Sequence, residues 1–116
     1  MTVGGEHISV MTDEVVRGLA PVDGGVYVDA TFGAGGYSAA ILRSAKCTVW
    51  GIDRDPLAQT FAKKLNQSYP GKITVLSGCF GDMEALLDAA GVGKVDGVAL
   101  DIGVSSMQID NPERGF

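Results

Sequence analysis

The sequence has few of the side chains that most often act in catalysis: one histidine and two cysteines among 116 residues. Cys47 and Cys79 lie far apart and fit no metal-ligand or redox spacing, so we expect two reduced, partly buried thiols and no metal site. No apolar run approaches the roughly 18 residues needed to cross a bilayer. Residues 1–11 lack the basic and apolar regions of a secretory signal. These absences argue against a disulfide-built, secreted or membrane-spanning protein and favour the cytoplasm.

Positive charge is also scarce. The chain has nine lysines and arginines and fourteen acidic residues, giving a formal net charge of −5. This balance argues against a chain that grips a nucleic-acid backbone by itself. No histidine or cysteine base accompanies Ser105 and Ser106, which argues against hydrolysis by a Ser triad. His7 has no local partner, and on its chemistry alone we interpret it as a surface residue.

What is present is an alternation of apolar segments and helical patterns, which predicts an α/β fold with a parallel sheet. The predicted strands are 26–29, 48–53, 72–77 and 95–101, and the predicted helices are 37–45, 56–66 and 82–90. A short helix over about 13–19, capped by Thr12-Asp13-Glu14, precedes them. We therefore divide the chain into an N-terminal segment, 1–25, and a ligand-binding unit, 26–116.

Residues 103–116 are predicted to be loop, since they are rich in Ser, Asn and Pro and show no periodicity. The fourth strand would then remain an apolar edge, which complete proteins avoid. We therefore expect a truncated chain, the first half of a doubly wound, mostly parallel sheet.

The strongest motif is the glycine-rich turn after the first strand, with Gly33, Gly35 and Gly36. Glycines allow positive φ and close approach of the backbone to a ligand, at the start of a helix with free N–H groups. Ser38 stands where the dinucleotide fingerprint has its third glycine, which counts against a pyrophosphate. Asp29, just before the turn, suits a cation instead. S-adenosylmethionine carries both an ammonium and a sulfonium group.

Asp53 ends the second strand, where an acid can bind the ribose hydroxyls of an adenosine cofactor. The same acid serves NAD, so Asp53 predicts a nucleoside and does not choose between cofactors. Asp55 is interpreted as a helix cap in preference to a ligand. After the third strand, Phe80 can pack on an adenine ring. Asp82 can either bind the adenine amine or cap the next helix, and we favour the cap.

A fourth polar group follows the fourth strand: Asp101, Ser105, Ser106 and Gln108. In open α/β sheets this edge holds the reaction centre. A carboxylate there can accept a hydrogen bond from an incoming nucleophile or from the cofactor's amino group.

Together these motifs resemble the bacterial methyltransferase family that acts on the N4 amine of a cytidine in small-subunit (16S) ribosomal RNA, the MraW-like family. The likeness covers nearly the whole chain and corresponds to the N-terminal portion of such proteins. The matching segments are HISV at 7–10, DATFGAGG at 29–36, IDRDP at 52–56, GCF at 78–80, DGVALDIGVSS at 96–106, Gln108, and ERGF at 113–116.

The resemblance implies a Rossmann-like class I methyltransferase domain whose helical insertion and last strands are absent here. Its partner would be ribosomal RNA or the assembled small subunit, with a homodimer allowed. The implied S-adenosylmethionine contacts are Gly35, Gly36, Tyr37, Asp53, Phe80, Asp101 and Gln108.

Family members known best carry histidine at the position of Tyr37, so a side-chain contact there is in doubt while a backbone contact would survive. His7, in the family-like opening, gains weight as a residue near the mouth of the site. Methyl transfer to the amine needs no metal, and Asp101 or the pair Ser105 and Ser106 would accept the amine's hydrogen bond. We expect the chain by itself to bind cofactor without catalysis.

Two other functions remain open. One is a nicotinamide-dependent oxidoreductase, which Asp29 and Ser38 disfavour. The other is a module that binds a nucleoside cofactor and catalyses nothing.

Overall fold

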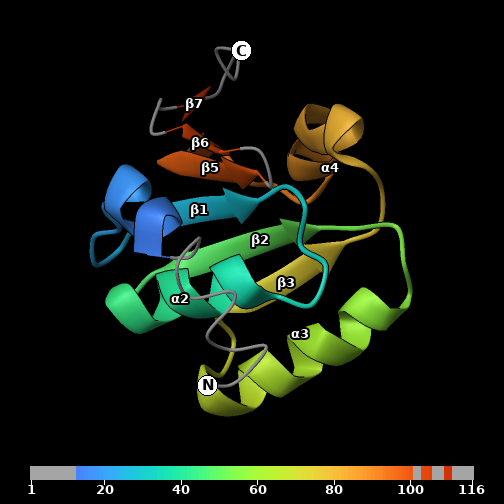
Figure 1. The fold of residues 1–116 in the computed structure, drawn as a ribbon. Helices are drawn as coiled ribbons and strands as arrows, with labels where there is room; N and C mark the ends of the chain where they lie inside the picture. Colours follow the sequence, from blue (N-terminus) through green and yellow to red (C-terminus); the bar gives the residue numbers. More distant parts are fainter. Residues whose placement is uncertain (1–12, 101–102, 106–108, 111–116) are drawn as a thin grey trace.

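The computed structural model describes residues 13–100, 103–105 and 109–110, the last two segments by their backbone. A five-stranded sheet in the order β3-β2-β1-β5-β6 forms the centre (Figure 1). Its first three strands are β1 (Val26–Asp29), β2 (Thr48–Ile52) and β3 (Ile73–Leu76). β1 pairs in parallel with β2 on one side and with β5 (Gly97–Leu100) on the other. The chain therefore reverses its direction of winding at β1, as in a Rossmann-like fold.

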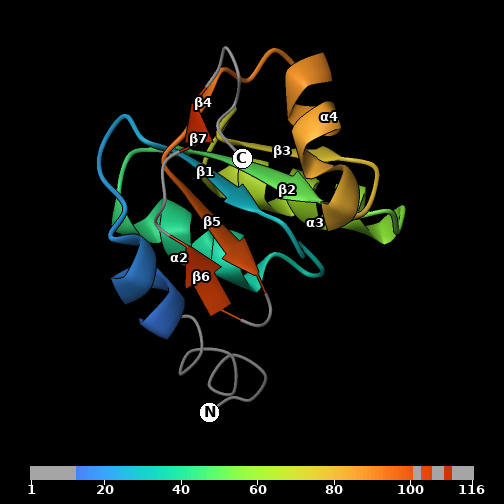
Figure 2. The same ribbon diagram turned by 90° about the horizontal axis from the view of Figure 1, so that it is seen from above.

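Helices cover both faces of the sheet (Figures 1 and 2). A helix over residues 13–19, together with α2 (Gly36–Ser44) and α3 (Leu57–Ser68), packs on one face around Tyr27 and Ile41. A 3-10 turn, η1 (Phe80–Asp82), leads into α4 (Met83–Ala89), which packs on the other face around Val28 and Leu87. Because both faces are covered, the strands are apolar runs rather than alternating ones.

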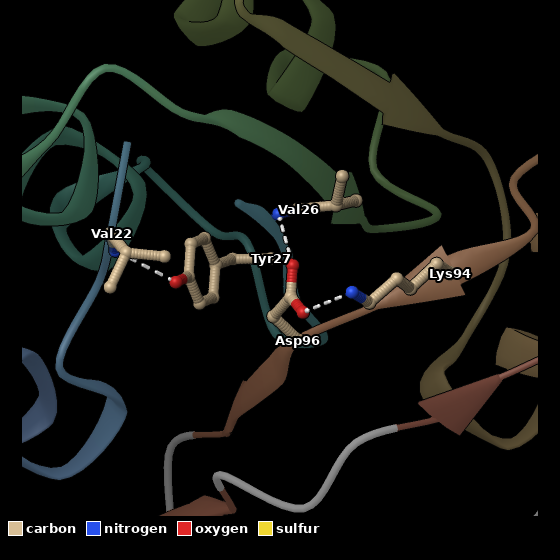
Figure 3. Close-up of polar contacts among 5 residues, drawn as sticks. All are labelled: Val22, Val26, Tyr27, Lys94 and Asp96. Atoms are coloured by element: carbon tan, nitrogen blue, oxygen red, sulfur yellow. Dashed lines mark hydrogen bonds and ion pairs between the residues drawn. The ribbon is translucent and has the colours of Figure 1, made fainter. Parts of the chain in front are cut away.

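The predicted strands and helices of residues 26–94 are confirmed, with small shifts at their ends. The predicted strand 95–101 is divided at Asp96 into β4 (Lys94–Val95) and β5 (Figure 3). The Asp96 Oδ2 accepts the N–H of Val26 at 2.9 Å, and the Asp96 Oδ1 lies 3.5 Å from the Lys94 ammonium. The Tyr27 hydroxyl accepts the N–H of Val22 at 2.9 Å. The Asp96 contacts join the start of β1 to the junction between β4 and β5. The Tyr27 contact joins β1 to the segment that precedes β1 in the chain.

The prediction of a loop over 103–116 is wrong where the structure describes it. β6 (Gly103–Ser105) pairs antiparallel with β5, and β7 (Ile109–Asp110) pairs antiparallel with β4. Only two residues separate β5 from β6, a connection short enough for a hairpin. Strands of two and three residues are too short to show a period-2 pattern. β5 is therefore covered by β6 and is not left as the bare edge that the sequence predicted.

Among the described residues, no helix combines the length and the apolar character needed to cross a bilayer.

Candidate functional site

The carboxyl ends of β1, β2 and β3 meet at one edge of the sheet, and the loops that follow them border an open hollow of about 280 Å³. Three of the residues predicted to form the site line it together: Gly33, Asp53 and Phe80. The full lining is Ala30, Thr31, Gly33, Ile52, Asp53, Arg54, Gly78, Cys79 and Phe80.

The glycine-rich turn has the backbone that only glycine adopts easily. Gly33 has φ of +55° and Gly35 has φ of +86°, and Gly35 caps the start of α2, whose first residue is Gly36. A Cβ on Gly35 would lie 3.0 Å from Phe32 Cζ and 3.1 Å from Leu65 Cδ1. A Cβ on Gly33 would meet only the Thr31 carbonyl oxygen, at 3.9 Å. Gly35 therefore packs against the core, while Gly33 leaves its backbone open to the hollow.

Asp53 ties the glycine turn to the end of β2. Its Oδ2 accepts the N–H of Gly33 at 2.8 Å, and its Oδ1 accepts the N–H of Asp55 at 2.8 Å. A carboxylate offers about four acceptor positions, so these two bonds leave capacity for hydroxyl donors. The interpretation of Asp55 as a cap is confirmed, because its Oδ1 accepts the N–H of Leu57 at 3.0 Å.

Asp29 does not line the hollow, although its neighbour in the chain, Ala30, does. The Asp29 side chain is fully buried, and the Ser38 hydroxyl donates to its Oδ2 at 2.7 Å. Ser38 is itself fully buried in the first turn of α2. The sequence identifies Ser38 only as a missing glycine. Ser38 lies in the first turn of the helix that follows the strand ending in Asp29, but the positions of the two residues in the sequence do not show that their side chains meet.

The third loop exposes Phe80 and Cys79 beside Asp53. The Phe80 side chain is 55% exposed, which leaves a ring face available to a ligand. The prediction that Cys79 is partly buried is wrong: it is exposed, with its Sγ 3.2 Å from Asp82 Oδ2. The prediction that Asp82 caps the next helix is wrong for its side chain: Asp82 occupies the N-cap position of α4 but forms no side-chain capping bond, and its Oδ2 accepts from the Cys79 thiol. Cys47 is buried, as a reduced core thiol should be.

Other predicted site residues lie elsewhere or beyond the described part. Tyr37 is half-buried and packs against the α2 and α3 face of the core. Ser105 lies in β6 with its backbone opposite Val98, so the predicted loop is wrong at this residue. Asp101, Ser106, Gln108 and His7 fall outside the described residues. Arg54, Cys79 and Thr31 also line the hollow, although the sequence analysis predicts none of them as a site residue.

This arrangement can hold a nucleoside. A carboxylate with spare acceptor capacity and an exposed aromatic ring border one hollow, which suits the hydroxyls of a ribose and the face of a base. The Gly33 backbone is uncrowded there, although its N–H already donates to Asp53. The described residues hold no group of three or more His, Cys, Asp or Glu side chains that could bind a metal ion.

Solved structures that share this fold include methyltransferases. An rRNA methylase from Streptococcus thermophilus superimposes with a TM-score of 0.58 at 20% identity, over 86% of this chain and 51% of that one. The C-terminal domain of precorrin-6Y C5,15-methyltransferase from Rhodobacter capsulatus gives 0.58 at 16% identity, over 79% of this chain and 61% of that one. Identities this low establish the fold alone, which is the Rossmann-like α/β fold of methyltransferases.

Sequence relatives are much more similar. The chain is 64% identical over 110 residues to the ribosomal RNA small subunit methyltransferase H of Rhodospirillum centenum, covering 95% of this chain and 33% of that protein. It is 58% identical over 110 residues to the protein of that name from Paramagnetospirillum magneticum, covering 95% of this chain and 35% of the relative. The chain thus spans about a third of the length of these relatives. Residues 4–116 match the MraW methylase family, and the chain belongs to that family.

Proposed function

We propose that this chain binds S-adenosylmethionine in the hollow at the carboxyl edge of the sheet. We further propose that it forms the cofactor-binding part of an enzyme that methylates the N4 amine of a cytidine in small-subunit ribosomal RNA. The substrate would be the RNA or the assembled subunit, the compartment the cytoplasm, and the assembly a monomer or homodimer. Because the chain spans about a third of its relatives, we expect it to bind the cofactor without transferring the methyl group by itself.

The arrangement of Asp53 supports this proposal most strongly. Its carboxylate already joins the glycine turn to the end of β2, and it faces the same hollow as Gly33 and Phe80. In this position it would accept hydrogen bonds from both ribose hydroxyls. Phe80 would pack on the adenine, and Gly33, Gly35 and Gly36 would pass their backbone beside the methionyl part.

Asp29 would contribute from below the glycine turn. A carboxylate in the protein interior stabilises a nearby cation more strongly than one in water does, because the local dielectric is low. Ser38 holds this carboxyl group in place at 2.7 Å. We propose that this pair favours a sulfonium-bearing ligand over a pyrophosphate, with the direct cofactor contacts made by Asp53, Phe80, the backbone of Tyr37, Asp101 and Gln108.

S-adenosylmethionine would supply an electrophilic methyl group, and the protein's task would be to place the target amine in line with it. The amine's lone pair is delocalised into the pyrimidine ring, so orientation matters more than acid–base strength. Positioning of this kind contributes up to roughly 7–11 kcal/mol in favourable cases. We propose Asp101, Ser105 and Ser106 as acceptors for the amine's N–H groups.

Calorimetric titration of the chain with S-adenosylhomocysteine, and separately with NADH, tests the cofactor proposal. We expect saturable binding of S-adenosylhomocysteine and none of NADH. Binding of NADH alone would replace the methyltransferase proposal with the oxidoreductase one.

A further inference from the structure

A second and larger hollow, of about 600 Å³, lies at the opposite edge of the sheet. The strands β1, β2 and β3 point the same way in Figure 1, so their amino ends share this edge. The hollow lies where α2 and α3 end and where β2 and β3 begin. Its lining is Asp23, Leu42, Arg43, Ser44, Ala45, Lys46, Cys47, Ser68, Tyr69, Pro70 and Lys72.

Three of the nine lysines and arginines of the chain line this one hollow: Arg43, Lys46 and Lys72. All three are exposed. Asp23 is the single carboxylate of the lining, and its Oδ1 already accepts the N–H of Lys46 at 2.8 Å. The hollow is therefore locally cationic in a chain whose formal net charge is −5.

Helix ends explain only part of this cluster. Arg43 stands in the last turn of α2 and Lys46 just after it, where cations complement the helix dipole. Lys72 comes from a different connection, between α3 and β3, and α3 has no basic residue in its last turn. The buried Cys47 lies close enough to Asp23 and Lys72 for both charges to act on its thiol. Burial and the Asp23 carboxylate raise the pKa of this thiol, while the Lys72 ammonium lowers it. Charges from separate segments thus converge on one space.

Two serines, Ser44 and Ser68, also line the hollow, and the remaining lining residues are apolar or aromatic. Tyr69 is half-buried and is followed by Pro70, and Leu42 and Ala45 lie on the side of α2. Cations beside an aromatic surface suit a ligand with phosphates and flat or apolar rings. A volume of about 600 Å³ exceeds the needs of a single phosphate and falls in the range of sites for nucleotide-sized ligands.

We propose that this hollow binds the sugar–phosphate backbone of an RNA strand, with Arg43, Lys46 and Lys72 on phosphate oxygens and Tyr69 beside a sugar or base. The inference rests on the proposed function, in which the substrate is RNA. The five residues of β2 span about 16 Å, so the two hollows lie at opposite ends of a short strand. A ribosomal RNA substrate is large enough to reach both edges, which a small molecule is not.

The test measures binding of the chain to a fluorescently labelled, mixed-sequence single-stranded RNA of about 20 nucleotides, by anisotropy at several salt concentrations. We expect the triple variant R43A/K46A/K72A to bind at least tenfold more weakly at low salt. Its salt dependence should be shallower, by about one unit of slope for each phosphate that the variant no longer binds. Lys63→Ala removes a lysine that is exposed on α3 and absent from the lining, and should change affinity less than twofold.

Asp23→Asn provides a change of opposite sign. It removes the carboxylate's charge and keeps an oxygen that can accept the Lys46 N–H, so RNA binding should tighten. Equal losses in the triple variant and in Lys63→Ala would overturn the proposal, as would absence of RNA binding by the unmodified chain. S-adenosylhomocysteine affinity, measured on the same variants, should stay unchanged. Failure of the unmodified chain to bind S-adenosylhomocysteine would instead count against the proposed cofactor function.

Discussion

The two edges of the sheet carry loops of opposite chemical character. At the carboxyl edge, the chain leaves β1 and β2 through glycines with positive φ and through Asp53, and the hollow presents backbone and a carboxylate. At the amino edge, the chain enters β2 and β3 after Lys46 and Lys72, and the hollow presents ammonium groups. Parallel strands thus separate two kinds of loop in space although they alternate along the sequence. Our two proposals assign the cofactor to the carboxyl edge and the RNA backbone to the amino edge.

The largest expected difference is in the free energy of unfolding, between alanine variants of one glycine at each edge. Gly35 and Gly71 both have positive φ, +86° and +73°, but only Gly35 is crowded by Phe32 and Leu65. Gly35→Ala should lower the free energy of unfolding by about 2–4 kcal/mol, from backbone strain and overpacking combined. Gly71→Ala should cost about 1 kcal/mol, from strain alone. Urea denaturation measures both, and equal losses would show that packing of the glycine turn against α3 contributes nothing.

A second comparison uses one aspartate from each edge. Asp53 accepts two backbone N–H groups and Asp23 accepts one, all at 2.8 Å, so replacing either with alanine removes local hydrogen bonds. Only Asp53→Ala should weaken binding of S-adenosylhomocysteine, by about 1–3 kcal/mol, as expected when a hydrogen bond to a charged group is removed. Calorimetry on both variants checks this. Unchanged affinity in Asp53→Ala would remove Asp53 from the proposed site.

A smaller effect is expected from the exposed aromatic ring. Phe80 and Leu57 are 55% and 60% exposed, and only Phe80 lines the carboxyl-edge hollow. Phe80→Ala should weaken cofactor binding by about 0.5–1.5 kcal/mol, the contribution of an aromatic stacking contact. Leu57→Ala is the matched control and should leave affinity unchanged. Both variants should retain unfolding free energies within about 0.5 kcal/mol of the parent.

The smallest expected effect is on the pH dependence of folding stability, and it arises at the amino edge. Burial raises the pKa of Cys47 above its ordinary value, so the folded state holds the thiol proton more tightly than the unfolded state does. The resulting stability is present below the ordinary thiol pKa and is lost as pH rises through the raised value. Burial raises the pKa of Tyr27 too, which extends the loss to higher pH. Chemical denaturation over a pH range from neutral to alkaline should show a decline that is smaller in Cys47→Ala. If stability declines equally in Cys47→Ala, the pH dependence arises from groups other than Cys47.

Much of the carboxyl edge was predictable from local signals. The glycine turn, the strand-ending Asp53 and the exposed Phe80 each follow a predicted strand, and topology requires that such positions meet. The burial of Asp29 under Ser38 was not predictable, because a strand-ending acid and a helix hydroxyl give no sign of which way either points. The exposure of Cys79 was not predictable for a similar reason, since a cysteine beside apolar residues is buried more often than not.

The cluster of cations at the amino edge could not be predicted from the sequence. Arg43, Lys46 and Lys72 are spread over 30 positions of an acidic chain, and the overall charge argued against contact with nucleic acid. Local order along the chain determined the strands, the helices and the glycine turn, because these depend on neighbouring residues. Tertiary structure alone decided which charges share a hollow, because that depends on how parallel strands align loops that lie far apart in the chain.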